Sequence, residues 1–545
     1  MSKIAEMSQE VASAGLSRRH FVQGAAALAA GAVLPMTQIL GASSVSAAPK
    51  SVLRVGIAKQ SAAPTPFTTK DGGSLQILCA PGEWLAWQNQ DGSLQPRVAE
   101  SWKSSNASKT WTFKIRRGIK FHDGTPLTAD DVVWTFKSHF DPKNKSAQLG
   151  NFKNSFTADG VVKVDDFTVR FDLLSSIGNF PYTVASTSYG SLIFKNGANG
   201  GPGWEKTMIS CGAWILESYV EGNRTIFKKN PNYWDKTRQP SFEKLELIQF
   251  ASASAATPLL RTGKLDAIAI LAEDAIKLSK TKFNLVLTPS AGGLHTHMRT
   301  DYGPFQDKRV REAAALTLDR PGYIKGVLKG FATLANDSVM DSYPTKDTTV
   351  PQRKKDIAKA KALMKAAGVP NGFAVDLSSW VRDDISKLAQ FIKKSFAEIG
   401  IKVTLKLDGS DGGGNVYYTY TPYPSKKGEV FAYDNNSWLA SNLGITDWAG
   451  RAVPDQYLSR EWRSTADWSS SHVNSPKLDA AIDEYLAAPN KAKQKSASKK
   501  IQGASLEETP YIIIYNQTII AAVRKGLKGF YVNGITQSET AGVTG

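Results

Sequence analysis

Residues 109–132 read Lys109-Thr-Trp-Thr-Phe-Lys-Ile-Arg-Arg-Gly-Ile-Lys-Phe-His-Asp-Gly-Thr-Pro-Leu-Thr-Ala-Asp-Asp-Val132. The alternation over Trp111–Ile115 predicts a β-strand with one buried face, because successive side chains of a strand point to opposite sides. Asp123-Gly124 predicts a turn. Thr128 with an acid three positions later, at Asp131, predicts an N-cap that opens a helix. The segment is therefore predicted to fold as a strand, a turn and the beginning of a helix.

Strands and helices alternate along the rest of the chain as well. The predicted elements are strands over Ser51–Ile57, Ile401–Leu405 and Tyr511–Val523, a hairpin over Val161–Leu173, and helices over Asp356–Ala367, Asp384–Ile399 and Lys477–Leu486. Ser475-Pro476 is a typical cap and first residue for the last of these helices. The run Gly409–Gly414 lacks the Lys-Ser/Thr pair of a phosphate-binding loop and is interpreted as a mobile loop. The pattern predicts an α/β protein with some antiparallel sheet.

The N-terminal segment has the layout of an export signal. Arg18 and Arg19 precede a mildly apolar run, Ala25–Val33, and small residues follow at Val45–Ala47. A positive region, an apolar region and small residues in this order are typical of a signal peptide. The paired arginines and the phenylalanine after them resemble the twin-arginine export motif. We therefore predict a twin-arginine signal peptide over residues 1–47, with an ordinary Sec peptide as the alternative, and a periplasmic location.

Composition and charge exclude several function classes. The chain has 545 residues, enough for three or four domain-sized units, and 67 Lys and Arg against 49 Asp and Glu give a formal net charge of +18. The lysines are dispersed or lie in helix-like segments, and no nucleic-acid motif accompanies them, so we expect no nucleic-acid partner. The sequence has no run of eighteen apolar residues, and no membrane-spanning helix is predicted.

Cysteine and histidine spacing gives little indication of metal or redox chemistry. Cys79 and Cys211 are the two cysteines of the chain, and their separation excludes a Cys-x-x-Cys motif and a multi-cysteine zinc site. In an exported protein they could form a disulfide, or they could be two buried free thiols. His295 and His297 share one face of a predicted strand and could form a metal pair or a polar strand edge. We predict no metal site and no cofactor.

Two neighbouring segments, Val98–Lys103 and Lys109–Val132, closely resemble the signature of the family 5 extracellular solute-binding proteins. These proteins are the peptide- and nickel-type binding components of ABC importers. Further similar segments follow in the order of the family: Lys229–Trp234, Leu260–Asp266, Pro304–Arg311 and Ala449–Asp455. The resemblance covers nearly the whole chain after the export signal.

The resemblance implies a two-lobed periplasmic-binding-protein fold with mixed sheets, in which two strands form a hinge and the ligand is enclosed between the lobes. The implied domains are lobe I over residues 48–288 with a subdomain inserted at about 88–185, lobe II over 289–510, and a return to lobe I over 511–545. The implied function is to capture a small solute and deliver it, as a monomer, to an inner-membrane ABC permease. Binding shifts the lobes toward closure only through differential affinity, so both lobes must contribute contacts.

The resemblance also implies where the ligand lies. Family ligands bind against the loop that here carries Trp448-Ala-Gly-Arg451, and Arg451 is the candidate anchor, because its planar fork binds carboxylates, phosphates and sugar hydroxyls. The alternative is that Arg451 pairs with Asp447 or Asp455. Gly450 has no side chain and would therefore leave room for the ligand next to Arg451. The further candidate ligand-binding residues are Trp448, Asp447, Trp438, Trp380 and, from lobe I, Trp84.

The sequence leaves alternatives for the class of ligand and for the function. A peptide is the commonest ligand of the family, and sugar, opine and chelate ligands are the alternatives. An exported hydrolase is the runner-up function, although the sequence has no G-x-S-x-G elbow, no H-E-x-x-H motif and no P-loop. We therefore predict a binding protein without enzymatic activity.

Overall fold

The computed structural model describes residues 51–60, 63–69, 71–278, 280–408, 417, 437–488, 490–535 and 537–545. The predicted signal peptide, with Arg18 and Arg19, and the Gly409–Gly414 run lie outside these residues. Residues 49–545 form one compact unit. In the described part of this unit, we find no helix long and apolar enough to cross a membrane.

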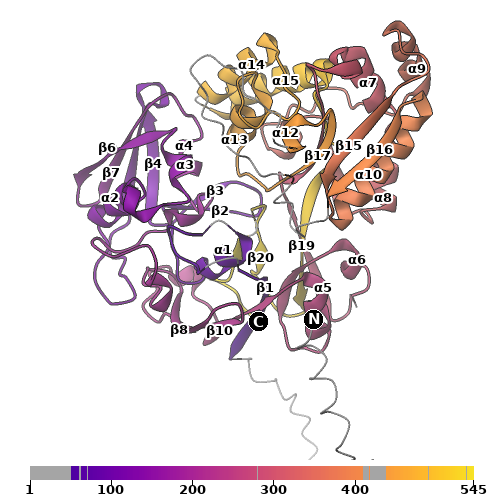
Figure 1. Ribbon diagram of the computed structural model, residues 1–545. Helices are drawn as coiled ribbons and strands as arrows, with labels where there is room; N and C mark the ends of the chain where they lie inside the picture. Colours follow the sequence, from indigo (N-terminus) through magenta and orange to yellow (C-terminus); the bar gives the residue numbers. More distant parts are fainter. Residues whose placement is uncertain are drawn as a thin grey trace, which may run out of the picture. The chain divides into compact units, whose positions relative to one another are not determined.

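Lobe I is built on an eight-stranded mixed sheet (Figure 1). The strands, in spatial order, are β12 (Phe283–Pro289), β19 (Tyr515–Arg524), β11 (Ala267–Ile270), β1 (Val52–Ala58), β10 (Lys244–Phe250), β9 (Arg224–Lys229) and β8 (Trp214–Val220), and β14 (Ala332–Leu334) pairs with β19. β1 is parallel to β10 and β11, so these three strands end at one edge of the sheet. Three helices follow strands at that edge: α1 (Gly72–Leu78), α5 (Ala253–Arg261) and α6 (Ala272–Ala275). Parallel strands of this kind place ligands outside their carboxyl ends.

The inserted subdomain contains a four-stranded antiparallel sheet. Its strands, in spatial order, are β4 (Ala99–Ser105), β5 (Thr110–Ile115), β7 (Thr168–Leu173) and β6 (Phe156–Asp165), with a separate hairpin β2 (Ala86–Gln88) and β3 (Leu94–Pro96). Helices α2 (Ala129–Ser138), α3 (Leu149–Phe152) and α4 (Phe180–Thr183) complete it. The strand, turn and helix predicted from residues 109–132 are confirmed: β5 buries Trp111 and Phe113, and the Asp131 carboxylate accepts a 2.7 Å hydrogen bond from the backbone N–H of Thr128.

Lobe II is built on a five-stranded sheet, whose elements are drawn mostly in orange in Figure 1. The strands, in spatial order, are β16 (Lys402–Asp408), β15 (Ala374–Trp380), β17 (Leu443–Trp448), β13 (Gly293–Met298) and β18 (Tyr511–Ile512). The helices are α7 (Lys308–Leu316), α8 (Arg320–Gly326), α9 (Ile357–Ala366), α10 (Asp383–Phe396), α12 (Ser437–Ala440), α13 (Asp455–Tyr457), α14 (Pro476–Ala487) and α15 (Lys491–Glu508). The predicted caps are confirmed: Asp356 accepts from the backbone N–H of Lys359, and Ser475 from that of Leu478.

The chain crosses between the two sheets at two adjacent places. The first crossing is at residues 290–292, between β12 and β13, and the second is at residues 513–514, between β18 and β19. The prediction of one long strand over Tyr511–Val523 is therefore wrong, because its first residues pair in lobe II and the others in lobe I. An apolar run suits burial in either sheet, so hydrophobicity alone does not reveal where sheet membership changes.

A C-terminal hairpin fills the junction next to these crossings. It consists of β20 (Tyr531–Val532) and β21 (Ser538–Glu539). Glu539 fixes it to lobe I through ion pairs with Arg97 at 3.1 Å and Arg238 at 2.9 Å. Burial raises the pKa of Glu539 to about 7, although the Arg97 charge opposes the shift. The hairpin thereby holds Gly534 against the first crossing, where the Ser290 hydroxyl donates to the Gly534 carbonyl oxygen.

Candidate functional site

The candidate site begins where two parallel strands of lobe II end side by side. β15 ends at Trp380 and β17 ends at Trp448, and the two strands pair in parallel. This register brings Trp380 to Asp447, so that the indole N–H donates to the Asp447 carboxylate at 3.1 Å. Two of the predicted site residues, 67 positions apart in the chain, are therefore in direct contact.

Asp447 has an arginine partner, and that partner is Arg382. The Arg382 guanidinium donates to the Asp447 carboxylate. It also donates two hydrogen bonds to the Asp384 carboxylate, at 2.6 and 3.0 Å. The same guanidinium lies 5.0 Å from the centre of the Trp380 ring, within the range of a cation–π contact. Asp447 is thus neutralised by a residue that the sequence analysis did not single out.

Trp438 and Trp448 are largely buried within an aromatic cluster. Each is 8% exposed, and their ring centres are 6.3 Å apart. Trp438 donates its indole N–H to the Thr446 hydroxyl at 2.8 Å, whereas the buried indole N–H of Trp448 has no partner among the described residues. Tyr457 packs against Trp448 at 5.3 Å between ring centres. Only a small part of either indole is therefore open to a ligand.

Arg451 is a partly buried cation without a carboxylate partner in the described part of the chain. Neither Asp447 nor Asp455 forms an ion pair with it there, and one terminal nitrogen of its guanidinium donates to the Gly450 carbonyl oxygen at 3.5 Å. Its Nε is buried with no partner among the described residues. A buried donor left unpaired is unfavourable, so this guanidinium is suited to an incoming acceptor.

Residues of both lobes surround Arg451. The Arg451 backbone carbonyl accepts from the Tyr343 hydroxyl at 3.1 Å. Burial raises the pKa of Tyr189, a residue of lobe I, and the positive charge of Arg451 acts in the opposite direction. Burial also raises the pKa values of Tyr343 and Tyr457 in lobe II, and the positive charge of Arg451 again acts to lower them. The guanidinium therefore lies within electrostatic reach of three tyrosines, one of them from the opposite lobe.

Gly450 is a packing residue, and the expectation that it leaves room for a ligand is corrected. A Cβ atom at this position would lie 2.2 Å from the Gly534 carbonyl oxygen and 2.8 Å from the Ser290 hydroxyl. Gly292, at the first crossing, also packs closely against Gly450, because a Cβ atom at Gly292 would lie 2.8 Å from the Gly450 backbone nitrogen. The loop before Arg451 thus lies directly against the C-terminal hairpin and the first crossing.

Trp84 does not face the junction of the lobes. It is fully buried in the lobe I core, 5.6 Å from the Trp87 ring between centres. The expectation that Trp84 contacts the ligand is corrected to a role in the core, as is typical of an aromatic residue that is buried on all sides.

A cavity of about 450 Å³ lies between the lobes. Its lining residues include Ala58, Gln76, Phe250 and Ile270 of lobe I, Tyr323 and Asp384 of lobe II, and Tyr515 and Gln517 of β19. None of the predicted site residues lines it, but Arg382 connects it to Asp447 through Asp384. Sequence reasoning missed these lining residues. For Ala58, Phe250 and Ile270 the available signal was their position at the ends of β1, β10 and β11, where parallel strands place ligands.

Direct hydrogen bonds join the subdomain to lobe II near Arg451. The Asn179 amide nitrogen donates to the Asp455 carboxylate at 2.9 Å, and the Asn179 amide oxygen accepts from Gln494 at 2.9 Å. Gln456 donates to Asn151 at 2.7 Å. Burial raises the pKa of Asp455 to about 6. Asp455 therefore serves as a contact between the lobes rather than as a counter-ion for Arg451.

Metal and disulfide chemistry finds no support within the described residues. No group of three or more His, Cys, Asp or Glu side chains there is arranged to hold a metal. His295 instead contacts Glu461 at 3.0 Å, and His297 contacts the Ser441 hydroxyl at 3.0 Å. Cys79 and Cys211 are both free thiols, packed against two different hydrophobic cores.

Two lobes joined by paired crossings, with a cavity lined from both lobes, are the architecture of a solute-binding protein. The chain belongs to the bacterial extracellular solute-binding proteins, family 5, whose model matches residues 93–469. Among curated proteins, it is 27% identical over 516 residues to the glutathione-binding protein GsiB of Pectobacterium atrosepticum, covering 91% of this chain and 94% of that protein.

Solved structures share the fold. The ABC transporter substrate-binding protein CtaP of Listeria monocytogenes superposes with a TM-score of 0.77 at 22% identity, covering 91% of this chain and 99% of that one. The periplasmic murein tripeptide-binding protein MppA, in its unliganded open form, superposes with a TM-score of 0.76 at 22% identity, covering 91% and 98%. The predicted family and the two-lobed fold are confirmed, and family membership favours solute binding over the hydrolase alternative.

Proposed function

We propose that this protein captures a short peptide or peptide-like solute between its lobes and delivers it to an inner-membrane ABC permease. The observation that carries the proposal is the 450 Å³ cavity lined from both lobes in a chain of this family. A cavity of this size falls within the range of small-molecule sites. Since both lobes line it, an enclosed solute stabilises the closed arrangement through contacts that the open one lacks.

Arg451 and the names of the relatives favour an acidic peptide-like ligand. A guanidinium with an unpaired buried Nε binds a carboxylate well, because charge-assisted hydrogen bonds are stronger than neutral ones. Relatives are named for binding glutathione and a murein tripeptide. Sugars, opines and metal chelates are the alternative ligand classes, and a thermal unfolding assay compares sugars and a metal chelate with peptides.

Addition of the correct ligand is expected to raise the melting temperature without consuming the ligand. The free energy of unfolding rises with the ratio of ligand concentration to Kd, by about 2.7 kcal/mol when the ligand concentration is a hundred times Kd. Thermal unfolding is measured with glutathione, tripeptides, neutral sugars and a nickel chelate, and calorimetric titration follows for each probe that shifts the transition. Mass spectrometry of the recovered probe is the control for turnover, and cleavage of the probe by pure protein would contradict the binding function.

We also propose that residues 1–47 direct export to the periplasm by the twin-arginine route. Replacement of Arg18 and Arg19 by lysine is expected to leave the precursor in the cytoplasm, because that route reads the arginine pair. Cell fractionation and immunoblotting measure the periplasmic yield, with a Sec-exported protein in the same cells as control. Normal periplasmic yield of the double variant would instead favour Sec export.

A further inference from the structure

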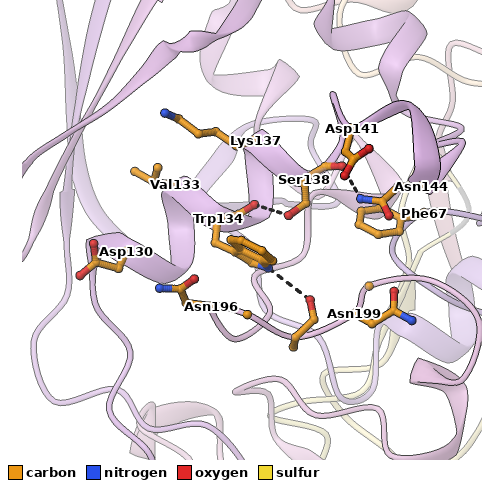
Figure 2. A pocket seen from close by; sticks show the side chains of 13 residues that line it. Phe67, Asp130, Val133, Trp134, Lys137, Ser138, Asp141, Asn144, Asn196 and Asn199 are labelled. Carbon is orange, nitrogen blue, oxygen red and sulfur yellow. Dashed lines mark hydrogen bonds between the residues drawn. The ribbon is translucent and has the colours of Figure 1, made fainter.

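A second cavity, of about 550 Å³, lies on lobe I and shares no lining residue with the cavity between the lobes. One wall is a face of α2 that carries Asp130, Trp134 and Lys137. The loop 196–200 forms another wall, and Phe67 and Asn144 also line the cavity (Figure 2).

The indole of Trp134 forms a fixed and partly open surface in this cavity. Trp134 is 38% exposed, which is unusual for a large aromatic side chain in a globular protein. Its Nε1–H donates to the Ala198 carbonyl oxygen at 3.2 Å, so the ring spans the space between α2 and the 196–200 loop (Figure 2). The backbone N–H of Asn196 donates to Asp131 at 2.9 Å and holds the loop to the start of the helix. The ring is therefore positioned before any ligand arrives.

Polar groups with unused hydrogen-bonding capacity surround the ring. The Asn196 side-chain amide has no hydrogen bond within the described residues, and Lys137 has no ion pair there. Asn144 uses its amide nitrogen to donate to the Ser138 carbonyl oxygen at 2.7 Å, which leaves its amide oxygen as an acceptor. The cavity thus offers both donors and acceptors next to an aromatic face.

The charges around the cavity nearly cancel. The Asp130 carboxylate is paired with Lys163 at 2.7 Å, so it contributes little net charge. Lys137 and Asp141 carry opposite charges on the same lining. The lining therefore has neither the cluster of cations that would favour a phosphate nor the excess of acidic groups that would favour a cationic ligand.

We propose that this cavity binds a neutral saccharide, with the C–H face of one pyranose ring stacked on Trp134 and its hydroxyls bonded to Asn144, Asn196 and Lys137. A hydroxyl donates one hydrogen bond and accepts others, and amide side chains match both roles. A neutral sugar also needs no net charge from the protein. The saccharide site is independent of the peptide-binding function proposed above, since the two cavities have no lining residue in common.

The test uses maltotriose and chitotriose as probes with the purified full chain. Saturation-transfer NMR and calorimetric titration are expected to detect saturable binding of at least one probe at millimolar concentrations. Trp134→Ala is expected to weaken that binding at least tenfold, whereas Trp134→Phe, which keeps an aromatic face, retains part of it. Trp102→Ala is the matched control, because it removes an indole of the same subdomain that does not line the cavity.

Circular dichroism and melting temperature establish that each variant is folded. The glutathione response of the interlobe site is expected to be the same in Trp134→Ala as in the wild-type protein. Absence of saturable binding of both sugars to the wild-type protein, or equal binding by folded Trp134→Ala, would overturn the proposal. Sugar binding that is lost in Arg451→Ala and kept in Trp134→Ala would overturn it as well, because the sugar would then occupy the cleft.

Discussion

Replacement of Asp337 by alanine is expected to lower the free energy of unfolding by about 3–5 kcal/mol. The Asp337 side chain is fully buried between two buried arginines, with Arg320 at 2.7 Å and Arg353 at 2.5 Å. Its other oxygen accepts from the backbone N–H of Ile513, in the second crossing between the sheets, at 3.0 Å. Alanine would leave two buried guanidinium groups without their carboxylate and the crossing without its hydrogen bond.

Urea unfolding at pH 7 measures this loss. Asp337→Asn keeps the shape of the side chain and is the variant to use if the alanine protein does not fold. The asparagine variant is also expected to be strongly destabilised. Glu398→Ala is the matched control, because the ion pair of Glu398 with Lys355 is exposed and pairs of this kind contribute about 0–1 kcal/mol. A change below about 1 kcal/mol for both Asp337 variants would show that the buried cluster does not stabilise the crossing.

Local elements of this fold could be predicted because their signals are contained in a few neighbouring residues. The capping pair Thr128 and Asp131 and the cap at Ser475 depend on atoms three or fewer residues apart, and the structure has the helices that they predict. The alternation over Trp111–Ile115 likewise reports on one strand. Such signals do not depend on how distant parts of the chain meet.

Sheet membership could not be predicted in the same way. Tyr511–Val523 is one apolar run, yet Tyr511 pairs with His297 in lobe II, and Thr518 pairs with Pro289 in lobe I. The change of sheet at residues 513–514 is determined by partners more than two hundred positions away. No local pattern carries that information, so the position of the crossing follows only from the tertiary structure.

Only part of the candidate site could be predicted, because its contacts also join distant parts of the chain. The family resemblance selected the loop at Arg451, but the partner of Asp447 is Arg382, which becomes a neighbour only because β15 and β17 are parallel. The close packing of Gly450 on Gly534 depends on a hairpin at the other end of the chain. Asp447 pairs with Arg382 and Asp455 accepts from Asn179, and no carboxylate among the described residues pairs with Arg451. Arg451 is therefore a stronger candidate anchor than the sequence alone indicates.

Replacement of Arg451 by alanine is expected to weaken ligand binding about tenfold to more than a hundredfold. A hydrogen bond to a charged group is worth about 1.5–3 kcal/mol, and about 1.4 kcal/mol corresponds to a factor of ten in Kd. The fold is expected to be unchanged, since Arg451 has no ion pair to lose within the described residues. Calorimetric titration with glutathione, or with the probe that raises the melting temperature most, measures the change.

Two further variants separate the role of the charge from the role of the side-chain shape. Arg451→Lys keeps the charge and is expected to recover only part of the affinity for a carboxylate ligand, because the planar fork that binds both oxygens is lost. Arg460→Ala is the matched control, since Arg460 is already paired with Asp467 and stacked on Trp468, and its loss is expected to change Kd less than twofold. Wild-type affinity in folded Arg451→Ala would assign the anchor to other groups, of which Tyr323, Asp384 and Gln517 already line the cavity. Full affinity in Arg451→Lys with loss in Arg451→Ala would instead mean that the ligand requires a positive charge at this position and not the fork.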